Sequence, residues 1–139
     1  MSGIVCPIRG GQESRPTIER AITYAKERDL PVYFLFVIDL GGIGLTEVPA
    51  HKKIVSHEMA NLASFVLLTA TIEADRDGVR AEGFTRFGHL ADEIIALVEE
   101  KAADAVVLGQ TKTGKAREAK TNLLVSKITD STQAEIILA

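Results

Sequence analysis

The sequence lacks tryptophan, has one cysteine and few other aromatic residues, and shows no excess of charge of one sign. A single cysteine, Cys6, excludes a disulfide within the chain and a zinc site built from cysteines. A formal net charge of −3, with Lys and Arg spread along the chain, lacks the basic footprint of a nucleic-acid or membrane-surface protein. No apolar run approaches the roughly 20 residues that a membrane helix needs, and no signal peptide is recognisable. We therefore expect a cytoplasmic protein.

What the sequence does contain is ordinary for a globular protein. Its 139 residues are 46% hydrophobic and 25% charged, which predicts one domain, residues 1–139, with a core of Val, Ile, Leu and Ala. No repeat, linker or low-complexity segment divides the chain.

Short apolar runs alternate with segments of helical spacing. Because most of these runs lack polar alternation, they are typical of strands buried on both faces of a parallel sheet. The third run, residues 79–86, is the weakest candidate for a central strand, since it carries polar alternates that suit a sheet edge. The expected strands are residues 3–8, 32–38, 79–86, 105–109 and 135–139, and the expected helices begin near Ser14, Pro49, Leu90 and before Leu123. This pattern predicts a flavodoxin-like α/β fold: a five-stranded parallel sheet of order 3-2-1-4-5 with helices on both faces.

The fourth strand runs into a glycine and lysine loop, from Gly109 to Lys115. In open α/β sheets ligands bind beyond the carboxyl ends of central strands, so function is expected at this loop. The loop matches G-x-x-x-x-G-K, the start of a P-loop, but Ala116 stands where that motif needs a hydroxyl for Mg²⁺. A true P-loop is therefore not expected.

Four segments together resemble the universal stress protein family: Ile4 to Ile8, Leu35 to Asp39, Gly88 with the following helix, and Ala103 to Gly109. The resemblance implies a fold of the flavodoxin-like or adenine nucleotide alpha hydrolase-like type and a stress-response binding or regulatory role. It also implies which residues a bound nucleotide would contact. In nucleotide-binding members, an Asp after the first strand contacts adenosine, a valine of the second strand contacts the base, and Gly-x₂-Gly-x₉-Gly-Ser/Thr holds ribose and phosphates.

Only two of these positions are kept when the family pattern is carried across. Val37 keeps the valine and Gly109 keeps the first glycine. Arg9 replaces the aspartate, Lys112 replaces the second glycine, and Asn122-Leu123 replaces the Gly-Ser pair. A lysine side chain occupies space where backbone must approach phosphate, and leucine removes a hydroxyl donor. The comparison predicts a member that does not bind ATP in the usual way.

The same substitutions leave an altered anion or nucleotide site open, because they gather positive charge at the predicted crevice. Arg9, Lys112, Lys115 and Arg117 would lie there, Gly114 would supply the displaced glycine, and the ligand would be ATP or AMP, with Mg²⁺. In the simpler alternative no ligand binds there: the lysine side chains are solvated on the loop, and Arg9 pairs with a carboxylate such as Asp39. The candidate binding residues are Arg9, Gly10, Val37, Gly109, Gln110, Lys112, Gly114, Lys115 and Asn122.

We expect neither a catalytic set nor a metal site. His51 and His57 are six residues apart on one predicted helix, so they face different directions and cannot chelate one metal as an i, i+4 pair can. His89 is expected to be a solvated residue at a helix start, with a ligand phosphate as the alternative. No Ser/His/Asp or Cys/His arrangement suggests nucleophilic catalysis, so slow ATP hydrolysis at the Gly109 loop is the only enzymatic alternative.

The last strand, from Glu135 to Ala139, ends at a predicted sheet edge with unpaired backbone groups. The family resemblance implies a homodimer that pairs this strand about a twofold axis. A further alternative is a regulatory domain related to those fused to transporters, which would meet a membrane partner through the sheet edge or the loop from Gly41 to Val48. Neither nucleic-acid binding nor membrane insertion is expected.

Overall fold

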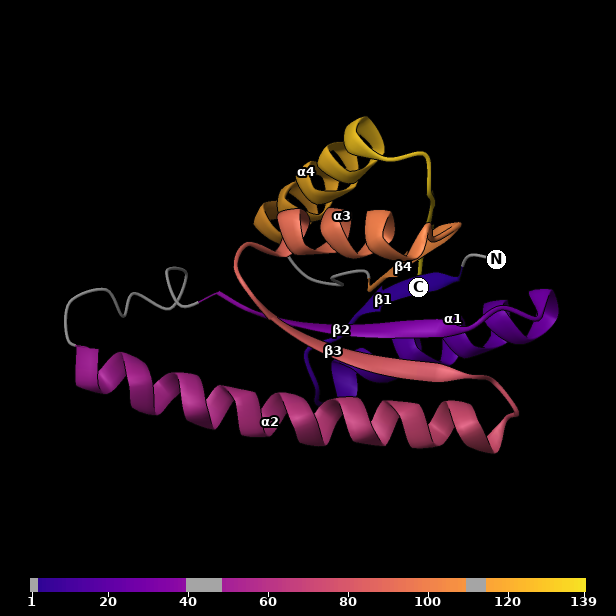
Figure 1. Ribbon diagram of the computed structural model, residues 1–139. Coiled ribbons are helices and arrows are strands. Elements are labelled where there is room, and N and C mark those ends of the chain that lie inside the picture. The colour runs from indigo at the N-terminus through magenta and orange to yellow at the C-terminus, as the bar shows by residue number, and fades with distance from the viewer. Residues whose placement is uncertain (1–2, 40–48, 110–114) are drawn as a thin grey trace.

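A parallel sheet forms the centre of the molecule (Figure 1). The computed structural model describes residues 3–39, 49–109 and 115–139, and within these ranges the sheet has five strands in the order β3-β2-β1-β4-β5. The strands are β1 (Ile4–Pro7), β2 (Val32–Ile38), β3 (Ala81–Phe87), β4 (Ala105–Leu108) and β5 (Glu135–Leu138). All four pairings are parallel, so the predicted order and direction are confirmed.

Helices cover both faces of the sheet, as predicted (Figure 1). They are α1 (Arg15–Arg28), which follows a 3₁₀ turn η1 (Gln12–Ser14), α2 (Pro49–Arg76), α3 (Leu90–Lys101) and α4 (Lys115–Ser131). The buried residues of α1 and α2 belong to one apolar cluster and those of α3 and α4 to another. The sheet separates the two clusters, which is the layered solution for strands that are apolar on both sides.

Side chains of the central strands alternate between these two clusters. Ile4 and Cys6 of β1 point toward α1 and α2, whereas Val5 between them points toward α3 and α4. β4 is buried along its whole length, as its run of apolar residues predicted. β3 forms one edge of the sheet, also as predicted, but it begins at Ala81 because Val79 donates its backbone N–H to the carbonyl of Ala74 in the turn after α2.

The inward face of α2 matches the apolar spacing only in part. That spacing predicts a buried stripe of Val55, Met59, Leu62, Val66 and Ala70; Val66 and Ala70 are buried and Val55 and Met59 are half-buried, but Leu62 is 46% exposed. A close approach to β3 explains the difference: a Cβ built on Gly83 would lie 2.9 Å from Leu67 Cβ, so small and branched residues of α2 press directly on this glycine. The buried residues of α2 are Ala63, Val66, Leu67, Ala70 and Ala74. Since α2 carries apolar residues on two opposite sides, periodicity alone does not decide which side is buried.

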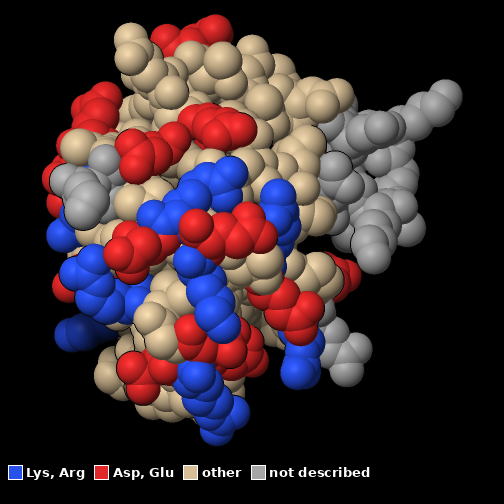
Figure 2. Space-filling view, turned by 90° about the vertical axis from the view of Figure 1, so that its right-hand side faces the viewer, with Lys and Arg blue, Asp and Glu red and all other residues tan. Residues whose placement is uncertain are grey.

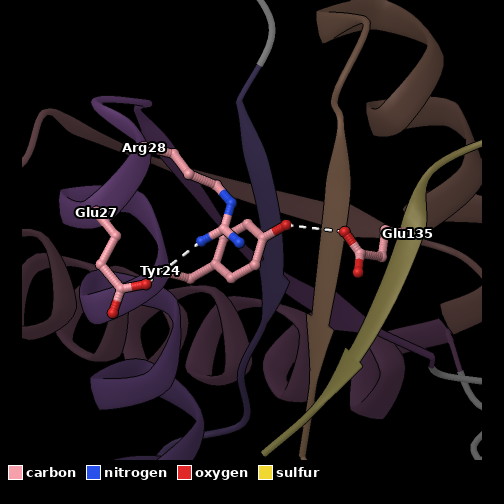
Figure 3. Close-up of polar contacts among 4 residues, drawn as sticks. All are labelled: Tyr24, Glu27, Arg28 and Glu135. Carbon is pink, nitrogen blue, oxygen red and sulfur yellow. Dashed lines mark hydrogen bonds and ion pairs between the residues drawn. The ribbon is translucent and has the colours of Figure 1, made fainter.

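A polar contact joins α1 to the last strand (Figure 3). The hydroxyl of Tyr24, a residue only 6% exposed, donates to Glu135 Oε2 at 2.9 Å. The guanidinium of Arg28 lies 3.6 Å from the centre of the Tyr24 ring, in cation–π geometry, and also contacts the Glu27 carboxylate at 3.5 Å. Tyr24 therefore fixes β5 to the helix that packs behind the sheet.

Tyr24→Phe should lower the free energy of unfolding by about 0.5–1.5 kcal/mol at neutral pH, because it deletes this hydrogen bond. Burial, together with the Glu135 carboxylate, raises the pKa of Tyr24. The stabilisation that depends on the proton is complete below the tyrosine pKa of the unfolded chain, about 10, and is lost as pH rises through the higher folded value. Urea denaturation at pH 8 and at alkaline pH should thus show a flatter pH dependence in the variant.

Tyr33→Phe is the matched control, because no described hydrogen bond involves the Tyr33 hydroxyl. It should change neutral-pH stability by no more than about 0.5 kcal/mol. Equal stability of Tyr24→Phe and the parent protein at pH 8 would contradict the role assigned to this contact.

Candidate functional site

The predicted crevice lies beyond the carboxyl ends of β1 and β4, where the chain turns to opposite faces of the sheet. β1 and β4 are neighbours, with Ile4 opposite Ala105 and Val5 opposite Val106. The chain leaves β1 for α1 on one face of the sheet and leaves β4 for α4 on the other (Figure 1). This divergence is the switch point at which open α/β sheets bind ligands. The residues that follow these strands, Arg9 and Gly10 after β1 and Gly109 after β4, are therefore brought to one edge.

Both glycines at this edge are required by packing. Gly10 has φ +91°, and a Cβ there would lie 2.7 Å from Val66 Cγ2 of α2. A Cβ on Gly109 would lie 2.6 Å from Thr17 Oγ1 in the first turns of α1. Close approach of helices to the loops explains why neither position accepts a side chain, independently of any ligand.

Ser14 has a different role from the helix cap that its position suggests. Although it precedes α1, its side chain makes no capping hydrogen bond. Instead Ser14 Oγ accepts the backbone N–H groups of Arg9 and Gly10, each at 3.1 Å, and it lies 3.3 Å from the Gly10 carbonyl. Ser14 is 93% buried, at 7% relative exposure, so these bonds form away from bulk water. The first two backbone donors after Pro7 and Ile8 are thus occupied from within the loop.

The end of β2 carries a second polar contact. Val37, the expected base contact, is half-buried and lies on the α3 and α4 side of the sheet. Asp39 Oδ2 lies 3.1 Å from His89 Nδ1, at the start of α3. The Asp39 contact that the structure describes is therefore with His89 and not with Arg9, whose side chain is exposed. His89 is solvated, as expected, with 76% of its side chain exposed.

The remaining candidates follow β4. Gln110, Lys112 and Gly114 lie outside the described residues, as does the segment from Gly41 to Val48. Lys115 is the first residue of α4, and its side chain is not described. Asn122 is exposed and belongs to the interior of α4, about two turns from the start of that helix. The structure thus brings Arg9, Gly10 and Gly109 to one edge and describes no side-chain contact between them.

A hollow that the sequence did not reveal lies at the opposite edge of the sheet. It has a volume of about 220 Å³ and lies between the end of α1, including Lys26 and Asp29, and residues 77–80. Figure 2 shows this side of the molecule, where basic and acidic side chains are interleaved without a patch of one sign. The residues that line the hollow precede β2 and β3, at the end of the sheet opposite the switch point, so we do not assign the candidate site to it.

Two classes of site are not formed by the residues that the structure describes. No three His, Cys, Asp or Glu side chains among them group as metal ligands do. Nor is any described helix long and apolar enough to cross a membrane.

Comparisons with known proteins agree with this geometry. A universal stress protein of Methanocaldococcus jannaschii is 30% identical over 112 residues, which cover 80% of this chain and 66% of that protein. The structure of the Lactobacillus plantarum universal stress protein UspA superposes with a TM-score of 0.78 at 16% identity, over 99% of this chain and 96% of that one. A universal stress protein from Archaeoglobus fulgidus, solved in complex with dAMP, gives a TM-score of 0.66 at 17% identity, over 99% and 97% of the two chains.

The solved structures share the fold at low sequence identity, whereas the family model tests the sequence itself. The model of the Universal stress protein family matches residues 1–131, nearly the whole sequence. The chain belongs to the universal stress protein family.

Proposed function

We propose that this chain is a stress-response regulatory module that acts through protein association and does not hold ATP in the manner of the nucleotide-binding members. One observation carries the proposal: Arg9 lies two residues after the end of β1, at the position where those members are expected to present an aspartate to adenosine. A carboxylate only accepts hydrogen bonds, and a guanidinium only donates them. The amino and hydroxyl groups of adenosine would therefore lose an acceptor at this position.

Neighbouring groups do not restore the missing contacts. The Asp39 carboxylate already contacts His89, and the Arg9 and Gly10 amides are bonded to Ser14. Leu123 stands in place of the phosphate-binding hydroxyl and lies inside α4 with 71% exposure. These observations support the loss of the adenosine and phosphate contacts together.

A binding role without catalysis fits the described side chains. Cys6 is fully buried, and its thiol donates to the carbonyl of Thr17 at an S···O distance of 3.9 Å. Burial raises the pKa of this thiol, which disfavours the thiolate that a nucleophile needs. We accordingly assign no enzymatic activity in this proposal.

An anion site is the second candidate. It is favoured by the exposed Arg9 guanidinium at the switch point, since arginine can form a bidentate pair with phosphate. The related Archaeoglobus protein was solved with dAMP, which makes adenine nucleotides the natural probes.

The purified protein should carry no nucleotide by mass spectrometry and should give no heat on titration with ATP, AMP or inorganic phosphate. The combined changes Arg9→Asp, Lys112→Gly, Asn122→Gly and Leu123→Ser should create ATP binding or raise its affinity at least tenfold, about 1.4 kcal/mol. Circular dichroism should accompany the titration, because a glycine inside α4 costs about 1 kcal/mol of helix stability.

Arg9→Ala separates the two candidates. It removes the guanidinium without supplying a carboxylate, so phosphate or AMP binding that is present in the parent and absent in this variant would favour the anion site. A folded, rebuilt variant with no gain in ATP affinity would refute the account given for the lost contacts.

The same proposal includes a homodimer through β5, as the family resemblance implies. Glu135 and Ala139 donate their N–H groups toward β4, to the carbonyls of Asp104 and Leu108. Because backbone groups alternate in direction along a strand, those of Ile136 and Leu138 face away from β4. β5 therefore offers a second copy an unpaired edge within the described part of the chain.

Leu138→Pro should abolish this pairing, because it removes an outward N–H and leaves the bonds to β4 in place. Sedimentation should show a smaller species than the parent at the same concentration. Leu138→Ala keeps the N–H and should retain the parent's mass. If Leu138→Pro sediments like the parent, the interface does not involve this edge.

A further inference from the structure

The outward face of α2 carries an unusual set of exposed apolar side chains. Phe65 is 69% exposed, Leu68 is 59% exposed and Ile54 is 57% exposed, and Leu62 and Ile72 are also among the exposed large hydrophobic residues. At about 100° of rotation per residue, these five positions fall on one side of the helix. We call this set, Ile54, Leu62, Phe65, Leu68 and Ile72, the outer stripe.

The outer stripe cannot be buried by rotation of its own helix. The opposite side of α2 is already packed on the sheet, with Ala63 and Ala70 fully buried and Leu67 Cβ pressed against Gly83. In Figure 1, α2 lies along the outside of the fold, and its far side points away from every other labelled element. No other element among the described residues covers the outer stripe.

We propose that a second copy of this chain covers the outer stripe, with the two α2 helices packed antiparallel about a twofold axis at Phe65. In this arrangement Phe65 meets its symmetry mate, and Leu62 meets Leu68 because each lies three residues from the axis. The five side chains expose on the order of 500 Å² of apolar surface, a large share of the roughly 800 Å² that each partner of a standard interface buries.

The charges that flank the outer stripe select the antiparallel direction. Lys53 lies twelve residues before Phe65 and Asp77 twelve residues after it, and both are exposed. His57 and Glu73 lie eight residues before and after the same point. An antiparallel pair therefore brings Lys53 to the level of Asp77 and His57 to the level of Glu73 along the other copy, on the two flanks of the seam, whereas a parallel pair would bring each charge to the level of its own copy.

Antiparallel packing has two further advantages. It opposes the dipoles of two long helices, each of 28 residues. It also places the long aliphatic stem of Arg76 over Ile54 of the other copy, since both residues lie eleven positions from Phe65.

This interface is separate from the one proposed for β5. α2 packs on β2 and β3, at one side of the sheet, and β5 forms the other edge. A chain with two different twofold interfaces assembles beyond a dimer, into a closed tetramer or a longer chain of molecules. The two proposals can therefore be tested one at a time in the full-length protein.

Phe65→Asp should reduce the mass measured by sedimentation velocity and raise the dissociation constant at least tenfold. Leu123→Asp is the matched control, because Leu123 is 71% exposed on α4 and lies outside the outer stripe. Leu138→Pro should leave a dimer that Phe65→Asp then converts to a monomer. An unchanged mass for Phe65→Asp, alone and in the Leu138→Pro background, would overturn the proposal. The same result is expected if a different protein covers the outer stripe, so that outcome also counts against a second copy.

Cysteine cross-linking tests the direction of packing. The native thiol of Cys6 is buried, so an introduced cysteine is the only exposed one. A mixture of Leu62→Cys and Leu68→Cys chains should form mixed disulfide-linked pairs under mild oxidation, and each variant alone should form few. Efficient self-pairing by each variant would demonstrate a parallel arrangement, and no pairing in any mixture would contradict the contact itself.

Discussion

Burial of the neighbouring strands β1 and β4 is the constraint on which the rest of this structure depends. Every residue of these strands except the half-buried Pro7 belongs to one of the two apolar clusters, so none of their side chains can act as a polar functional group. Polar and charged residues can act only where these strands end. The loops after β1 and β4 therefore have two duties: they must return the chain to a helix on the correct face, and they are the only place near the switch point where a ligand can be met.

The first duty already accounts for most of what the loops contain. Gly10 and Gly109 lie against Val66 and Thr17, and the Ser14 hydroxyl ties down the turn after β1. In a nucleotide-binding relative, similar glycines would be explained by close approach of backbone to phosphate. In this chain, the packing of α1 and α2 against the loops already requires glycine at these two positions. A kept glycine is thus weak support for a kept ligand, and the changed polar residues, above all Arg9, are more informative.

This distinction also explains how far the sequence predicts the structure. Strand order and buried strands follow from apolar runs such as β2 and β4, where local pattern and tertiary burial agree. The inward face of α2 could be predicted only in part: Val66 and Ala70 of the expected stripe are buried, but Leu62 is exposed, because α2 packs through Leu67 on Gly83 of a strand that comes later in the chain. Ser14 is a similar case: its position suits a helix cap, but amides five and four residues earlier compete for the same hydroxyl. The contact of Asp39 with His89 and the exposure of Arg9 depend on the paths of the loops, which periodicity does not specify.

The two proposals, a switch point that offers adenosine few acceptors and an apolar face of α2 that binds a second copy, agree with each other. A ligand site needs a few polar groups placed at the strand ends; the carboxylate described there, that of Asp39, contacts His89, and the Arg9 guanidinium can only donate hydrogen bonds. An association surface needs apolar area that the fold itself does not bury, and α2 provides it on the side opposite its own core contacts. Both features can change without disturbing β1 and β4, because neither draws on the side chains of these strands. Both proposals therefore place recognition at positions that leave the core of the layered fold unchanged.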